Sequence, residues 1–157
     1  MVIRESGLIF RGFSLVKKSY HKTDVGKIDE DLRSALMTAL LNFAESTFSA
    51  KLIEYFELKK FCIAFSQANI QSGDGFEPET LLAYAIIDNE KKMDKYVQKI
   101  AKPFLSQSLN QFITDNEGEN LSEVRKYQYF KKNLDEIFGS TVKTLDERLN
   151  GVLFWFF

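Results

Sequence analysis

The sequence predicts an α/β (α+β) fold in which one five-stranded, mainly antiparallel sheet has helices on both faces. Short apolar runs of β-type composition recur before residue 90, and two of them, at 61–65 and 81–87, contain no charged residue. Strands that are covered on both faces have such unbroken apolar runs. Beyond residue 88 the apolar residues instead recur every three or four positions, which is typical of amphipathic helices. These helices can supply the cover that the sheet needs.

The first two predicted strands form a hairpin. Residues 7–10 are a short apolar run, Arg11-Gly12 is a turn signal, and residues 13–20 continue as an extended stretch. Lys17 and Lys18 lie in the second strand. Because charge is typical of strands at the border of a sheet, we expect the second strand to be an edge.

A first helix follows the polar stretch 21–28. Asp29 or Asp31 can cap its start. Apolar residues then recur at spacings of three and four to about residue 46, which predicts one stripe whose alanines allow close packing on a sheet. The stripe consists of Leu32, Ala35, Leu36, Ala39, Leu40 and Phe43.

The remaining strands are predicted at 52–58, 61–65 and 81–87. The strand at 52–58 contains Glu54 and Glu57 and is therefore expected at an edge. The strands at 61–65 and 81–87, together with the first, are expected inside the sheet. Turn-forming residues at 69–78 predict a loop between the last two strands.

Two helical stretches complete the predicted domain. The first spans 93–113, and Pro103 is expected to kink or divide it. The second spans 124–138 and precedes Gly139, a residue that commonly follows helix ends. We place a main domain at residues 1–115 and expect residues 116–157 to be a helical extension that packs on the same domain.

The order of these elements resembles the longin-domain family and the related roadblock domains. The segments that carry the resemblance are GLIF before the first turn, SLVKKSY after it, and DEDLRSAL at the start of the first helix. It covers roughly residues 5–115, and the chain looks most like a free-standing archaeal member. The resemblance implies a longin/profilin-like sheet of order 2-1-5-4-3, with the first helix on one face and the C-terminal helices on the other. Longin domains occur in adaptor small subunits, vesicle SNAREs and TRAPP-complex subunits.

No constellation of catalytic or metal-binding residues is recognisable, so we expect no enzyme, no metal and no cofactor. The chain has one histidine, His21, in a polar stretch, and one cysteine, Cys62, in an apolar run. It contains neither G-x-x-x-x-G-K-[ST] nor G-x-G-x-x-G. The net charge of −1 and the scattered basic residues lack the basic surface of a nucleic-acid-binding protein.

The sequence favours a cytoplasmic location. No apolar run approaches the ~20 residues that cross a bilayer, and the first residues lack the pattern of a signal peptide. A single cysteine fits a reducing compartment. We expect any contact with membranes to be peripheral. In a longer chain, the apolar segment 152–157 could also be the start of a membrane helix.

We predict a non-catalytic protein-binding or scaffolding module that engages a small GTPase or a trafficking-complex subunit and can form a homodimer. In longin domains the groove between the first helix and the third strand often receives a partner. On that resemblance the partner-binding residues are Leu36, Leu40, Ile53, Tyr55 and Phe56, and the alternative is that most of them fill the core.

The aromatic C-terminus is a second candidate for binding. Phe154, Trp155 and Phe157 can pack back on the domain, form a dimer contact, or dock on a membrane or a partner. A different class of function is a small-molecule sensor with a ligand between helix and sheet. An enzyme with a shallow acidic site is the least favoured class.

Overall fold

The computed structural model describes residues 3–20, 34–40, 42, 55–57 and 61–139. Its strands are β1 (Ile3–Phe10), β2 (Phe13–Ser19), β3 (Tyr55–Glu57), β4 (Phe61–Ile70) and β5 (Glu79–Asp88). They pair in the order β2-β1-β5-β4-β3, and every pair is antiparallel. Four strands form the body of the sheet, to which β3 adds three residues paired with β4. The predicted α+β class with an antiparallel sheet is confirmed.

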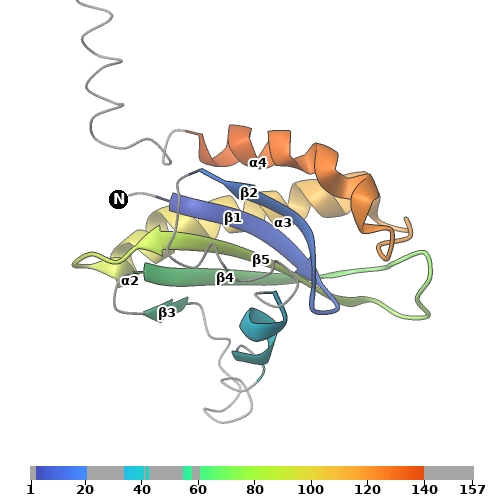
Figure 1. The fold of residues 1–157 in the computed structure, drawn as a ribbon, viewed down its shortest axis with the longest axis horizontal. Helices are drawn as coiled ribbons and strands as arrows, with labels where there is room; N and C mark the ends of the chain where they lie inside the picture. The colour runs from blue at the N-terminus through green and yellow to red at the C-terminus, as the bar shows by residue number, and fades with distance from the viewer. Residues whose placement is uncertain (1–2, 21–33, 41, 43–54, 58–60, 140–157) are drawn as a thin grey trace, which may run out of the picture.

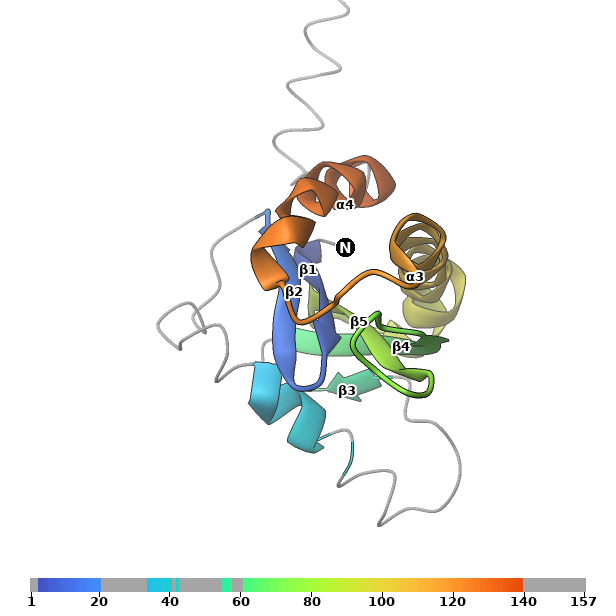
Figure 2. The same cartoon turned by 90° about the vertical axis from the view of Figure 1, so that its right-hand side faces the viewer.

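Helices lie on both faces of this sheet (Figures 1 and 2). Residues 34–40 are helical and lie on one face. The longer helices, α3 and α4, lie on the other face. The elements of that second layer are α2 (Met93–Tyr96), η1 (Val97–Ala101), α3 (Lys102–Asn116), η2 (Val124–Phe130) and α4 (Lys131–Phe138).

The sequence predicted a kink or a division of the helix at Pro103, and the structure shows a change in helix type there. Proline lacks an N–H and its ring clashes with the carbonyl four residues earlier, so it is tolerated best in the first turn of a helix. The structure places Pro103 in the first turn of α3. The π-helical segment η1 directly precedes α3, and its wider turn is a common way to accommodate a local disruption of α-helical bonding.

The larger hydrophobic core lies between the sheet and the layer formed by α3 and α4. Leu8, Phe112, Tyr127 and Phe130 are among its fully buried members. The rings of Phe112 and Phe130 meet edge to face with centroids 5.3 Å apart, a favourable aromatic geometry. Because η2 and α4 contribute to this core, residues 116–138 pack on the same domain as the sheet.

A smaller core lies on the opposite face, beneath residues 34–40. Within the helical segment that the structure describes, Met37 is the residue that belongs to this core. The ring of Tyr84 crosses β1 at Gly7, where a Cβ atom would lie 2.7 Å from that ring. Glycine at this position therefore allows the ring to lie flat against the strand. The buried members of the cluster are Ile9, Met37, Ile63, Phe65, Leu82, Tyr84 and Ile86.

The border of the sheet at β2 is covered by η2. Gln128 of η2 donates a hydrogen bond from Nε2 to the backbone carbonyl of Leu15 over 2.9 Å. A carbonyl at a sheet border is otherwise open to pairing with another strand. β2 is thus less able to pair with an added strand than its position at the edge of the sheet suggested.

The hairpin of β4 and β5 is longer than predicted. Residues 66–69 are polar or small, and they continue the ladder with β5 up to the pair of Ile70 and Glu79. The apolar run had predicted an end at residue 65. Backbone pairing does not require apolar side chains in the solvated part of a hairpin, which explains why the composition underestimates its length.

Candidate functional site

The apolar stripe predicted on the first helix faces outward within its described part. Leu36 is 52% exposed and Leu40 is 40% exposed, and Ala35 and Ala39 are exposed beside them. Met37 is instead the residue that packs on the sheet. The interpretation that Leu36 and Leu40 fill the core is therefore wrong. Within residues 34–40, Met37 contacts the smaller core, whereas Leu36 and Leu40 do not.

The other predicted partner-binding residues do not join this stripe. Tyr55 of β3 is half-buried against the larger core, on the opposite face of the sheet, and its hydroxyl donates to Asp94 Oδ1 over 3.4 Å. Tyr55 therefore does not share a surface with Leu36 and Leu40, because the strand alternation sends its side chain to the other face of the sheet. The backbone of Phe56 pairs with Ile63. Ile53, Phe154, Trp155 and Phe157 lie outside the described residues.

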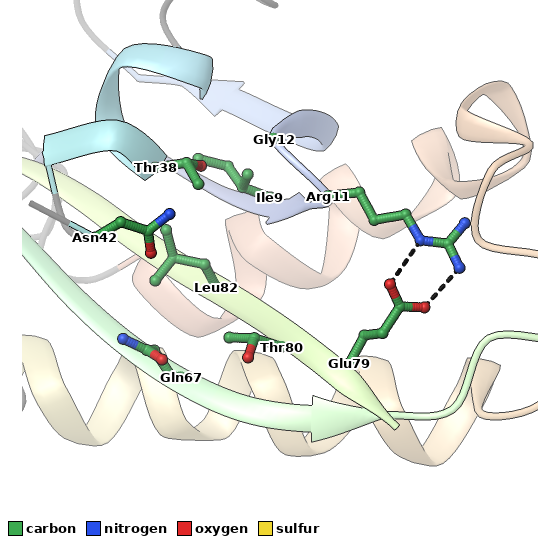
Figure 3. A pocket seen from close by; sticks show the side chains of 9 residues that line it. All are labelled: Ile9, Arg11, Gly12, Thr38, Asn42, Gln67, Glu79, Thr80 and Leu82. Carbon is green, nitrogen blue, oxygen red and sulfur yellow. Dashed lines mark hydrogen bonds and ion pairs between the residues drawn. The ribbon is translucent and has the colours of Figure 1, made fainter. Parts of the chain in front are cut away.

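A cleft of about 530 Å³ lies between the inner side of the first helix and the sheet (Figure 3). Its volume is in the range typical of small-molecule sites. Two apolar side chains from neighbouring strands and several hydroxyl and amide groups surround it. The lining residues are Ile9, Arg11, Gly12, Thr38, Asn42, Gln67, Glu79, Thr80 and Leu82.

Thr38 is one of the lining residues, but its hydroxyl oxygen is not accessible to solvent from the cleft. Its Oγ1 atom is buried, and no hydrogen-bond partner lies within reach. A buried hydroxyl without a partner costs about 1–3 kcal/mol of stability. Such groups in folded proteins are normally explained by a bound water, an ion or a functional role.

An ion pair closes one end of the cleft. Arg11 donates from Nε to Glu79 Oε1 over 2.9 Å and from Nη2 to Glu79 Oε2 over 2.5 Å, so the pair is bidentate (Figure 3). Its Nη1 donates to Asp74 Oδ2 over 3.1 Å and to Ser122 Oγ over 3.0 Å. The guanidinium of Arg11 is therefore bonded to two carboxylates.

These hydrogen bonds stabilise the charged forms of the carboxylates. Bonds from Ser122, Ser72 and Arg11 hold the pKa of Asp74 well below its usual range. The bond from Arg11 lowers the pKa of Glu79 below its ordinary value. Both groups are ionised at neutral pH, so neither has the raised pKa that a carboxyl needs to act as a general acid there.

The position of Arg11 depends on a tight turn of unusual conformation. Arg11 has φ of 54° and Gly12 has φ of 80°. Positive φ at both central residues is the pattern of a type I′ turn, whose twist matches that of a hairpin. Arginine is not among the residues that favour this conformation. Its side chain is bonded to Glu79 and Asp74.

Two further loops complete this end of the molecule. Gly73 in the β4–β5 loop donates its N–H to the carbonyl of Glu119 over 2.7 Å, and Gly118 donates to the carbonyl of Gln71 over 2.8 Å. A Cβ atom at Gly73 would lie 2.5 Å from the carbonyl oxygen of Gly118. The two loops thus approach each other through their backbones. The loop predicted from the Gly-Asp-Gly sequence therefore supports the Arg11 cluster.

A second, apolar hollow of about 290 Å³ lies on the other side of Arg11. It is lined by Phe10, Arg11, Phe13, Leu15, Leu121, Ser122 and Val124. Phe13 at its rim is half-exposed, and Phe76 at the tip of the β4–β5 hairpin is fully exposed. These two aromatic residues are separate from the leucine stripe.

One carboxylate is buried in the part of the domain that the structure describes. Glu5 on β1 is 2% exposed, and its Oε2 atom accepts a hydrogen bond from the hydroxyl of Tyr84 over 2.7 Å. Its Oε1 atom lies 3.4 Å from the hydroxyl of Ser19, which donates to it. A buried carboxylate needs such partners to remain in the core. Glu5 is not among the residues that line the cleft.

The cysteine of the chain is in a structural position. Cys62 is buried on β4, and burial raises the pKa of its thiol to about 12. No group of three or more His, Cys, Asp or Glu in the described ranges is arranged to hold a metal ion. His21 lies outside those ranges. Of the helices that the structure describes, none is both long enough and apolar enough to cross a membrane.

Sequence reasoning did not identify the residues of the cleft. They come from β1, the first helix, β4 and β5, and their positions along the chain show no common motif. One weak signal was present. Gln67 and Thr80 continue, at the period of a strand, the face that carries Phe65 and Leu82. Polar residues in such positions indicate where an apolar sheet face ends.

Comparison with known proteins gives no family for this chain: no family model matches it, and no match was found among curated proteins or solved structures.

Proposed function

We propose that the protein is a non-catalytic, longin-like protein-binding module whose partner is a small GTPase or a trafficking-complex subunit. The observation that carries the proposal is the outward orientation of the apolar stripe on the first helix. Leu36 and Leu40 are one helical turn apart and both exposed. Leucines in this arrangement can anchor a partner that covers one face of a helix.

The arrangement of the sheet supports the longin-like part of the proposal. The described strands pair in the order β2-β1-β5-β4-β3. This is the order that the resemblance implies, with the first helix on one face and α3 and α4 on the other. In such a fold the first helix is free to receive a partner, because the C-terminal helices cover the opposite face.

The state of the carboxylates supports a function without catalysis. Glu79 and Asp74 are held in the ionised form by Arg11 and neighbouring hydroxyls. Glu5 is buried and bonded to Tyr84. A general acid or base requires a carboxyl that can reach a substrate and exchange its proton near neutral pH.

A titration of small GTPases against the full chain tests this proposal. A panel of Ras-like GTPases, each loaded with GDP or with a GTP analogue, is measured by calorimetry. The expected result is that at least one member binds and that the double variant Leu36→Asp/Leu40→Asp loses the affinity. Phe76→Asp is the matched control, because it places a charge at an exposed apolar residue elsewhere. Equal affinity of all three proteins would refute the assigned surface, and no binding by any GTPase would refute the partner class.

The proposal also includes a cytoplasmic location and a homodimer that uses the aromatic C-terminus. The dimer is tested separately. Light scattering is compared for the full chain and for the variant in which Phe154, Trp155 and Phe157 are changed to Ser. We expect the mass to fall from two copies to one. A single copy in both proteins would refute the dimer and leave the GTPase proposal unaffected.

A further inference from the structure

The apolar hollow beside Arg11 lies on the face of the sheet that carries the larger core. Phe10, Leu15 and Leu121 line it and belong to that core, and each is at most 2% exposed. Phe13 also lines the hollow, but it is 55% exposed. Phe13 is therefore the apolar side chain of the hollow that another molecule can contact most readily.

The size of the hollow favours one large side chain of a protein partner over a small molecule. Its volume of about 290 Å³ is just below the range of about 300–1,000 Å³ that is typical of small-molecule sites. Protein partners, by contrast, commonly insert a single aromatic or aliphatic side chain into a pocket. A second uncovered aromatic residue, Phe76, directly follows Gly75, where a Cβ atom would lie 3.3 Å from Arg11 Nη2. Exposed apolar side chains that gather around a hollow are typical of a protein contact surface.

The charges at this end of the molecule show which partner fits. Segments 11–12, 71–79 and 115–126 meet here and are joined by hydrogen bonds (Figure 2). Together they contain seven carboxylates and three cations, a net charge of −4. An anionic membrane surface or a nucleic acid would be repelled by this charge, whereas a basic protein segment would be attracted. The charged residues are Arg11, Asp74, Glu77, Glu79, Asp115, Glu117, Glu119, Glu123, Arg125 and Lys126.

From these observations we propose that the hollow docks a basic segment of a partner protein. A large apolar side chain of that segment enters the hollow beside Phe13, and lysines or arginines on either side of it face the surrounding carboxylates. Glu123 is the exposed carboxylate that lies between two lining residues in the sequence. This inference goes beyond the proposed binding surface, because Leu36 lies on the helix that covers the opposite face of the sheet. The two surfaces can therefore be tested independently.

The first experiment measures the binding of three fluorescent peptides to the full chain by anisotropy. The test peptide has phenylalanine and leucine at its centre and two lysines on each side. One control replaces the lysines by glutamates, and the other replaces the central pair by serines. We expect the test peptide to bind with Kd below about 1 mM, and at least about tenfold more tightly than either control. Its affinity should fall at least about threefold between about 0.05 M and about 0.5 M NaCl, because salt screens the attraction. No binding of the test peptide, or equal binding of either control, would overturn the proposal.

Variants then place the bound peptide. Phe13→Ser should weaken binding at least about tenfold, because it removes the exposed aromatic contact. Glu123→Lys should weaken it about threefold and reduce its salt dependence. Glu90→Lys is the matched control, since Glu90 is equally classed as exposed but lies beyond the other end of β5.

The Tm of each variant is measured beside its affinity, so that a loss of folding is recognised. Unchanged affinity of a folded Phe13→Ser, or equal losses in Glu123→Lys and Glu90→Lys, would show that the hollow is not the site. If light scattering shows a dimer that Phe13→Ser disrupts, the hollow is occupied by a second copy of the chain, and the proposal is likewise overturned.

Discussion

Replacing Met37 by alanine should destabilise the protein far more than replacing Leu36 by alanine. The two residues are neighbours on the first helix, yet Met37 is 4% exposed and Leu36 is 52% exposed. The change at Met37 removes three buried heavy atoms, which corresponds to about 2–3 kcal/mol at ~0.8 kcal/mol for each methylene-sized group. A cavity in this smaller core would add to that cost. The change at Leu36 should stay within about 0.5 kcal/mol, as is usual for exposed positions.

Urea denaturation followed by circular dichroism measures both values. With a slope of about 2 kcal/mol per molar urea, the midpoint of Met37→Ala should fall by roughly 1 M and that of Leu36→Ala by less than about 0.3 M. Both variants carry the new alanine in the same helix, and methionine and leucine have similar helix propensities, so differences in helix propensity are small. A larger loss at Leu36 would mean that the leucine faces the sheet, and would refute the orientation on which the proposed binding surface rests.

Three further predictions concern the sheet and its loops. Gly7→Ala should destabilise the fold by about 1–3 kcal/mol in urea denaturation, because the new methyl group would contact the Tyr84 ring and a carbonyl of β2 at 2.7 Å; an unchanged midpoint would contradict the packing. Since the folded-state pKa of Glu79 lies below its ordinary 4.5, its stabilising contribution is present above that value and is lost as the pH falls. Between roughly pH 6 and pH 3, the free energy of unfolding should therefore fall less for Glu79→Gln than for the parent. If the free energies of unfolding of the two proteins fall in parallel with pH, the ion pair does not contribute as described. The Cys62 thiol should react with Ellman's reagent only in denaturant, because burial raises its pKa to about 12; rapid reaction in native buffer would disagree with its burial.

The pattern of apolar runs was sufficient to predict the buried strands. Residues 61–65 and 81–87 have no charge because both faces of β4 and β5 are covered, one by α3 and one by the first helix. The turn at Arg11-Gly12 was likewise predictable from its glycine. These features depend on residues that are adjacent in the sequence or on the alternation of buried and exposed positions along a strand. The sequence is therefore enough to predict them.

The rotation of the first helix was not predictable from the same pattern. Its stripe of Leu36 and Leu40 has the periodicity of a core-facing surface, and Met37 lies off that stripe. Periodicity identifies an apolar face but does not say whether the rest of the domain or another molecule covers it.

The cleft was not predictable either, for a different reason. Its lining residues come from four elements, and only the pairing of β1, β4 and β5 brings Ile9, Gln67 and Thr80 to the same end of the sheet. The ion pair of Arg11 with Glu79 spans 68 positions of the chain. Spatial neighbours at such separation leave no local signal in the sequence.

Photocrosslinking from position 36 tests the central claim most directly. Benzoylphenylalanine is introduced at Leu36 in one protein and at the more exposed Phe76 in another, and each is irradiated in the presence of the GTPase that binds in the titration. A crosslinked complex from position 36 that is absent from position 76 is the predicted result. Crosslinking from position 76 alone would contradict the assignment of the first helix as the binding surface.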